Sequence, residues 1–218
     1  THVQFAAYDQ DREAVIKRAL DAGVWMVNVG TQSDTSRAAV ELARKYEKGL
    51  YAAVGLHPVH TAKSYHDPKE LGGGEASKGF TSRGEDFDYD YYLQLARDPK
   101  VVAIGECGLD YFRVGKENEK SSAEKQKEAF LRQIRLAHEV GKPLMIHCRE
   151  AYDDLIAILQ ECKNLLVSPT PGVAHFFAGS KKHAQELLGL GFCFTFGGVV
   201  TFARDYDDVI KTIPDDRI

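Results

Sequence analysis

Histidine and glutamate side chains follow four short apolar runs of the sequence. They are His57 in GLHP, Glu106 in GEC, His147 in IHCR and His175 in AHFF. Imidazole nitrogens and carboxylate oxygens are common protein ligands of Zn²⁺, Mn²⁺ and Mg²⁺. A carboxylate has two oxygens, so Glu106 could bridge two ions about 3.5–4 Å apart, as in two-metal hydrolases. These residue types indicate a divalent-metal site if the fold brings them together.

Six apolar segments bounded by glycine or proline predict the strands that would position these residues. They cover residues 24–30, 50–58, 101–106, 143–148, 172–177 and 192–198. Capping and terminal-glycine signals predict helices between them, including helices over residues 9–23, 121–141 and 180–191. Strands alternating with helices indicate an α/β fold with a parallel sheet, whose carboxyl ends share one edge. We therefore expect the polar residues to converge at that edge.

The stretch VVAIGECGLDYF, residues 101–112, contains two acids separated by an expected turn at Gly108 and Leu109. An apolar strand without polar alternation is typical of a parallel sheet that is covered on both faces. A carboxylate buried there alone would be strongly unfavourable. We interpret Glu106 as balanced by cations, and Asp110 as either orienting a ligand histidine or capping the loop.

Each residue also has a structural interpretation. A single histidine at a strand end is more often hydrogen-bonded within the fold than bound to a metal, whereas four polar residues at successive strand ends favour a functional site. Histidines outside this pattern are assigned no function; they are His60, His66, His138 and His183. The aromatic residues flanking the site could stack on bases or pack as ordinary core and rim residues; they are Tyr111, Phe112, Phe176 and Phe177.

Length and composition favour one domain over residues 1–218. The chain is 44% hydrophobic and 28% charged, which is typical of globular proteins. Residues 60–92 contain GGGEASKG and EDFDYDYY with little apolar periodicity, so we predict a mobile loop insertion there. The glycine-rich segment follows no strand and lacks a GK[ST] ending, which argues against a nucleotide-triphosphate site.

Charge and cysteine content narrow the location and the partners. The formal net charge of −4 provides no general basic face, so a nucleic acid would have to bind at a local site. The four cysteines form no CxxC pair and are expected to be free thiols in a reducing compartment. No apolar run is long enough to cross a bilayer. We therefore expect a cytoplasmic protein without a membrane partner.

Four motifs resemble, in the same order, those of the TatD family of metal-dependent deoxyribonucleases. They are YAAVGLHP (51–58), GECGLDY (105–111), KPLMIHCR (142–149) and HFFAGS (175–180). GLHP alone would be weak, but the ordered set is specific and covers nearly the whole chain. The resemblance implies a TIM-like (β/α) barrel of the metal-dependent hydrolase type. It also implies cleavage of DNA phosphodiester bonds, often by 3′–5′ trimming of single strands, by a protein that we expect to be a monomer.

The resemblance also implies the roles of individual residues. Glu106, His147 and His175 match metal ligands of the family, and His2 matches the second histidine of its amino-terminal H-x-H pair. We expect two divalent ions, Zn²⁺, Mn²⁺ or Mg²⁺, which would activate water and offset phosphoryl charge. The catalytic residues would be Glu106, together with His57 for phosphate contact or proton transfer and Arg149 for phosphate contact.

The chain also departs from the family pattern at its two ends. The first histidine of the H-x-H pair would precede Thr1, and an E-T-D segment with a further ligand would follow Ile218. We therefore expect the chain to lack the first and last barrel strands and to be part of a longer protein. Two other functions stay open at this point: hydrolysis of a small amide or ester, as in amidohydrolase-like relatives, and a non-catalytic binding role.

Overall fold

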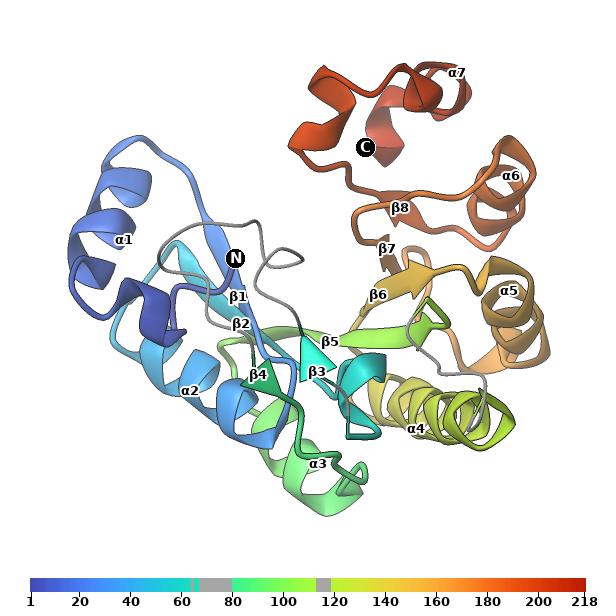
Figure 1. The fold of residues 1–218 in the computed structure, drawn as a ribbon. Helices are drawn as coiled ribbons and strands as arrows, with labels where there is room; N and C mark the ends of the chain where they lie inside the picture. The colour runs from blue at the N-terminus through green and yellow to red at the C-terminus, as the bar shows by residue number, and fades with distance from the viewer. Residues whose placement is uncertain (64, 67–79, 113–118) are drawn as a thin grey trace.

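Six parallel strands form one sheet in the order β1-β2-β5-β6-β7-β8 (Figure 1). This computed structural model describes residues 1–63, 65–66, 80–112 and 119–218. The strands are β1 (Met26–Val29), β2 (Leu50–Val54), β5 (Val101–Asp110), β6 (Leu144–Arg149), β7 (Gly172–Ala174) and β8 (Cys193–Phe194). Each strand overlaps one predicted segment, and all neighbours pair in parallel. The predicted α/β fold with a parallel sheet is confirmed.

Figure 1 shows the sheet curving from β1 to β8, with helices along its outer side. The helices are α1 (Arg12–Asp21), α2 (Ser33–Arg44), α3 (Tyr89–Ala96), α4 (Glu119–Val140), α5 (Tyr152–Glu161), α6 (Lys181–Gly189) and α7 (Asp207–Ile210). Helix α6 begins after Ser180, whose hydroxyl accepts from the His183 N–H as an N-cap. Helix α4 begins at Glu119, two residues before its predicted start at residue 121.

The described residues form an arc of sheet, with β1 and β8 at its two ends. Thr1 lies along the edge of β1 that is opposite β2, and its amino group donates to the Val27 carbonyl oxygen at 2.9 Å. The Val29 N–H donates to the Thr1 carbonyl oxygen, also at 2.9 Å. This is the hydrogen-bond pattern of a parallel neighbour. It places the residue after Thr1, His2, at the carboxyl edge of the sheet.

Strand β5 extends further than its sequence suggests. The predicted turn at Gly108 and Leu109 is wrong, because both residues continue the strand and pair with β6 as far as Asp110. Gly108 has φ +134°, and a Cβ atom there would lie 2.1 Å from the His147 carbonyl oxygen. Glycine therefore marks a close approach of two strands at this position.

The pairing of β5 with β6 also shifts by one residue at Glu106. A β-bulge of this kind re-aims the side chain of the extra residue. The Glu106 backbone N–H accordingly donates to the Gly30 carbonyl oxygen, on the side of β1, rather than to β6.

Part of the segment 60–92 is structured. Strands β3 (Tyr65–His66) and β4 (Phe80–Thr81) form an antiparallel pair. Phe87 and Tyr92 are buried in the main core, with their rings stacked 4.5 Å apart. The prediction of a mobile loop is therefore wrong for these described residues. It relied on the lack of apolar periodicity, but isolated aromatic residues can be buried without producing a periodic pattern. GGGEASKG (72–79) lies outside the described residues, and the single domain over 1–218 stays a prediction.

Candidate metal centre and active site

Three side chains from neighbouring strands meet at the carboxyl edge of the sheet. His57 follows β2, Glu106 belongs to β5 and His147 to β6. One potential ligand atom from each lies within 4.8 Å of the others. Glu106 Oε1 is 3.1 Å from His147 Nδ1 and 3.7 Å from His57 Nε2. The predicted convergence at this edge is therefore confirmed for these three residues.

Asp110 holds the opposite side of the His147 ring. Its Oδ2 atom lies 2.8 Å from His147 Nε2, and its Oδ1 atom accepts from the Phe112 N–H at 3.1 Å. His147 thus lies between two carboxylates, one at each ring nitrogen. A carboxylate behind a metal-ligating imidazole fixes its tautomer and orientation. This geometry agrees with the interpretation of Asp110 as an orienting residue, and the side chain also caps the loop.

Proton affinities at the site follow from this arrangement. Burial lowers the pKa of His147, but hydrogen bonds to Asp110 and Glu106 outweigh it and raise the pKa to about 9. Burial raises the pKa of Glu106, but His57 and His147 outweigh it and hold the pKa well below its usual range. His147 is therefore an imidazolium held between two carboxylates at neutral pH.

The tautomers of two histidines separate a hydrogen-bond donor from a metal ligand. The Val59 N–H donates to His57 Nδ1 at 3.3 Å, so in a neutral ring Nε2 carries the proton. Burial lowers the pKa of His57 to about 3, which keeps the ring neutral. His2 shows the reverse: its Nδ1–H donates to the Val29 carbonyl oxygen at 2.9 Å, which leaves a lone pair on Nε2. In this arrangement His2 could hold a metal through Nε2, and His57 could donate a hydrogen bond through its own Nε2.

His2 and His175 flank the group of three without belonging to it. Burial lowers the pKa of each, and the charge of Glu106 acts on both in the opposite direction. His175 follows β7, and its Nδ1 lies 3.2 Å from the Thr195 hydroxyl, which also accepts from the Phe176 N–H. Sequence reasoning missed Thr195, and its position after β8 was the available signal.

Arg149, at the end of β6, lies over an aromatic ring at the rim. Its guanidinium carbon is 3.4 Å from the centroid of Phe112, which is 47% exposed. Phe176 is also 47% exposed. Phe177 instead packs against Tyr152 and Phe194 and is buried, so it is a core residue and cannot stack on a base.

Comparisons with known proteins give the family. The family model described as TatD related DNase matches residues 1–218. The chain belongs to this family. An uncharacterized metal-dependent hydrolase, YabD of Bacillus subtilis, is 36% identical over all of this chain and 75% of its own length. A 3′-5′ ssDNA/RNA exonuclease TatD of Erwinia amylovora is 33% identical over all of this chain and 74% of its own.

Solved structures agree with the family assignment. YjjV, a TatD homologue from Escherichia coli, superposes with a TM-score of 0.74 at 30% identity, covering 98% of this chain and 73% of its own. A TatD family hydrolase from Entamoeba histolytica gives a TM-score of 0.72 at 25% identity, covering 98% and 65%. The predicted TIM-like fold of the metal-dependent hydrolase type is confirmed. This TatD family member is a metal-dependent hydrolase that acts on ester bonds.

The side chains at the edge fit the metal that this family implies. Imidazole nitrogens combined with a carboxylate suit Zn²⁺ or Mn²⁺. His147 has its second nitrogen already held by Asp110, and His2 presents an unprotonated nitrogen. These are the partners that a ligand imidazole needs behind it.

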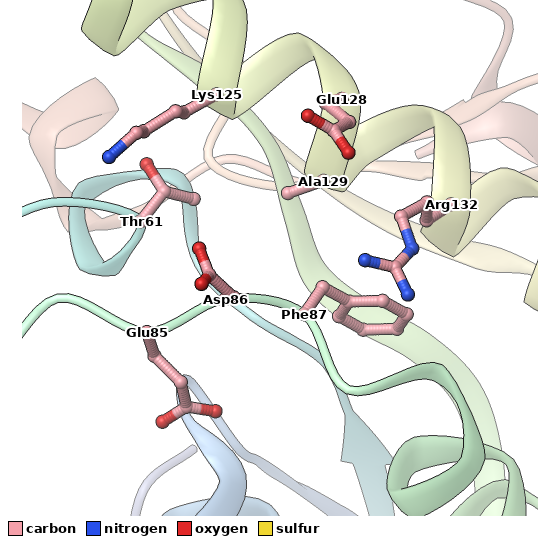
Figure 2. Close-up of a pocket in the computed structure, with 8 residues that line it drawn as sticks. All are labelled: Thr61, Glu85, Asp86, Phe87, Lys125, Glu128, Ala129 and Arg132. Atoms are coloured by element: carbon pink, nitrogen blue, oxygen red, sulfur yellow. The ribbon is translucent and has the colours of Figure 1, made fainter.

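A hollow of about 290 Å³ lies between α4 and residues 85–87 (Figure 2). Its charged side chains are of both signs: Glu85, Asp86, Lys125, Glu128 and Arg132. The Arg132 guanidinium lies over the Phe87 ring, 5.8 Å from its centroid. A hollow with more acids than bases gives a polyanion no net attraction.

The helices of the described residues lack the combination of length and apolar character that crossing a bilayer requires. A cytoplasmic location and the absence of a membrane partner stay predictions. His60, which was assigned no function, is buried, and its ring centroid lies 6.0 Å from that of His57.

Proposed function

We propose that this TatD family member hydrolyses DNA phosphodiester bonds, trimming single strands from the 3′ end as a cytoplasmic monomer with two divalent cations. The observation that carries the proposal is His147 held between Glu106 and Asp110, with the donor-ready His57 ring 4.2 Å away. Metal ligands and a neutral hydrogen-bond donor at one strand edge match the needs of phosphoryl chemistry.

Glu106 and His147 would hold the cations, with His2 and His175 as flanking ligands. Zn²⁺, Mn²⁺ or Mg²⁺ bound there would polarise the phosphate and lower the pKa of a coordinated water. Glu106 is ionised at neutral pH because its pKa is held low, so both its oxygens can accept. Asp110 keeps the His147 ring oriented through Nε2 and leaves Nδ1 to face Glu106.

His57 and Arg149 would act on the phosphate. His57 Nε2–H points toward the side of Glu106, where a phosphoryl oxygen would accept its hydrogen bond. Because its pKa is lowered to about 3, His57 serves as a neutral donor at pH 7 rather than as a cation. Arg149 can contact a backbone phosphate through its guanidinium while it lies over the Phe112 ring.

Two observations support a single-stranded nucleic acid as substrate. Phe112 and Phe176 are exposed beside the site, and an unpaired base can stack on such rings. The Erwinia amylovora relative is named as an exonuclease of single-stranded DNA and RNA. Because the net charge of −4 provides no general basic face, we expect the nucleic acid to be bound by this local group of side chains.

The experiment is digestion of a 5′-labelled single-stranded oligonucleotide with Mg²⁺, Mn²⁺ or Zn²⁺, with and without chelator. We expect progressive shortening that requires metal and is abolished in Glu106→Ala. Glu128→Ala is the matched control, since Glu128 is an exposed glutamate in the hollow of Figure 2. Metal-dependent turnover of neutral amides or esters without DNA cleavage would contradict the proposal. So would an active Glu106→Ala variant with unchanged metal content.

A further inference from the structure

Two buried glutamines of α4 hydrogen-bond to backbone residues at the site in the way that a neighbouring strand would. Gln126 Oε1 accepts from the Asp110 N–H and its Nε2 donates to the Asp110 carbonyl oxygen, both at 2.8 Å. Gln133 Oε1 accepts from the Leu56 N–H at 2.9 Å, and its Nε2 donates to the Leu56 carbonyl oxygen at 3.0 Å. Each side-chain amide therefore binds one backbone residue at two points.

The spacing of the two glutamines explains how a single helix reaches two strands. Seven residues separate Gln126 from Gln133, which is two turns of α-helix and about 10 Å along its axis. Both side chains consequently lie on the face of α4 that packs against the sheet, and only 3% and 1% of their respective surfaces are exposed. Glutamine suits this position because its amide offers both an N–H donor and a carbonyl acceptor, as a peptide unit does. Gln133 Nε2 also donates to the Ala129 carbonyl oxygen at 3.3 Å.

The backbone residues that they bind lie directly behind the chemistry. Asp110 is the residue whose carboxylate holds His147 Nε2. Leu56 immediately precedes His57, whose ring faces Glu106. Gln126 therefore acts on the metal-ligand side of the site, and Gln133 acts on the side of the phosphate donor.

We propose that Gln126 and Gln133 are positioning residues, which fix Asp110 and His57 so that the metal ligand and the phosphate donor keep their relative geometry. The inference rests on the proposed function and deepens it. It assigns separate roles to two chemically identical contacts: Gln126 sets metal affinity through Asp110 and His147, and Gln133 sets turnover through His57.

The test exchanges each glutamine for methionine in the full chain and measures Co²⁺ affinity by visible absorption, which requires no substrate. We expect Gln126→Met to weaken Co²⁺ binding about tenfold, as the loss of support behind a ligand does. Gln133→Met should keep Co²⁺ affinity within about twofold and lower kcat instead. Each variant controls for the other, because both remove a buried two-point contact from the same helix.

A double variant separates positioning from general support of the fold. If Gln126 acts through Asp110, Gln126→Met combined with Asp110→Asn should bind Co²⁺ no more weakly than Asp110→Asn alone. Should Gln126→Met not fold, Gln126→Glu keeps the Oε acceptor and nearly the same volume, replaces the donor to the Asp110 carbonyl oxygen by an oxygen, and adds a negative charge. Because that charge by itself favours a nearby cation, weaker Co²⁺ binding in this variant would still indicate lost support of Asp110.

Three results would count against the assignment in distinguishable ways. Equal changes of Co²⁺ affinity in the two methionine variants, with equal losses of thermal stability, would overturn the positioning roles alone. Additive losses in the double variant would do the same. A parent chain that binds no Co²⁺ would overturn the proposed metal site, and this inference with it.

Discussion

Metal binding at His147 should release close to one proton per ion at neutral pH. In the metal-free site the pKa of His147 is raised to about 9, so the ring is an imidazolium at pH 7. The pKa values of Glu106, His57 and His2 are all lowered, so these groups carry no proton that metal must displace there. Metal ligands bind in their deprotonated form. Bound metal must therefore take the place of the His147 proton.

The size of this competition follows from the distance between pH and pKa. At pH 7 the ring lies two units below a pKa of about 9, so proton competition weakens apparent metal affinity by about 100-fold, or ~3 kcal/mol. The sign is that affinity rises with pH. We expect about a tenfold gain per pH unit between pH 6.5 and 8.5, levelling off above pH 9.

Calorimetric titration with Mn²⁺ at pH 7 measures the effect directly. Two buffers with different ionisation enthalpies give the number of protons released, which should be near one. In Asp110→Asn, His147 loses one carboxylate partner, so its pKa should fall. The pH at which metal affinity stops rising should then be lower than in the parent. A pH-independent affinity without proton release in the parent would show that His147 is neutral, which refutes the clamped-imidazolium reasoning.

Three further predictions concern stability and substrate binding. In the presence of chelator, the ion pairs of His147 stabilise the fold fully below the ordinary pKa of histidine, and this stabilisation is lost as pH rises through about 9. Urea unfolding should therefore show that the free energy of unfolding falls by ~3 kcal/mol over this range. The fall should be absent in His147→Asn. Gly108→Ala places a Cβ atom 2.1 Å from the His147 carbonyl oxygen at φ +134°, so thermal unfolding should reveal a loss of at least ~2 kcal/mol. Arg149→Lys loses the guanidinium contact with the Phe112 ring, and KM for an oligonucleotide should rise about threefold with kcat nearly unchanged; an unchanged KM would remove Arg149 from the substrate site.

The strands were predictable because buried parallel strands are nearly continuous apolar runs. Each of the six predicted segments overlaps a strand of the observed sheet. The extent of β5 was not predictable, since Gly108 is equally suited to a turn and to a close approach between strands. Phe87 and Tyr92 were missed as core residues because a single aromatic side chain in an acidic segment leaves no periodic signal.

The site was predictable in composition but not in detail. The sequence places His57, Glu106 and His147 at strand ends, and parallel pairing brings them together. The sequence contains no information on which ring nitrogen carries the proton, because that depends on backbone partners such as Val59 and Val29. Gln126 and Gln133 leave a faint signal, namely polar residues seven apart on the apolar face of an amphipathic helix.

The charge balance of the site explains how a buried strand tolerates two acids. Without metal, Glu106 and Asp110 contribute two negative charges and the His147 imidazolium one positive charge, which leaves a net −1. When a divalent cation replaces the proton, the same three side chains and the ion sum to zero. The proton on His147 therefore offsets part of the negative charge that the metal would offset in full. Because the proton leaves one negative charge unbalanced, the metal-free site keeps an electrostatic attraction for the cation that its proposed chemistry requires.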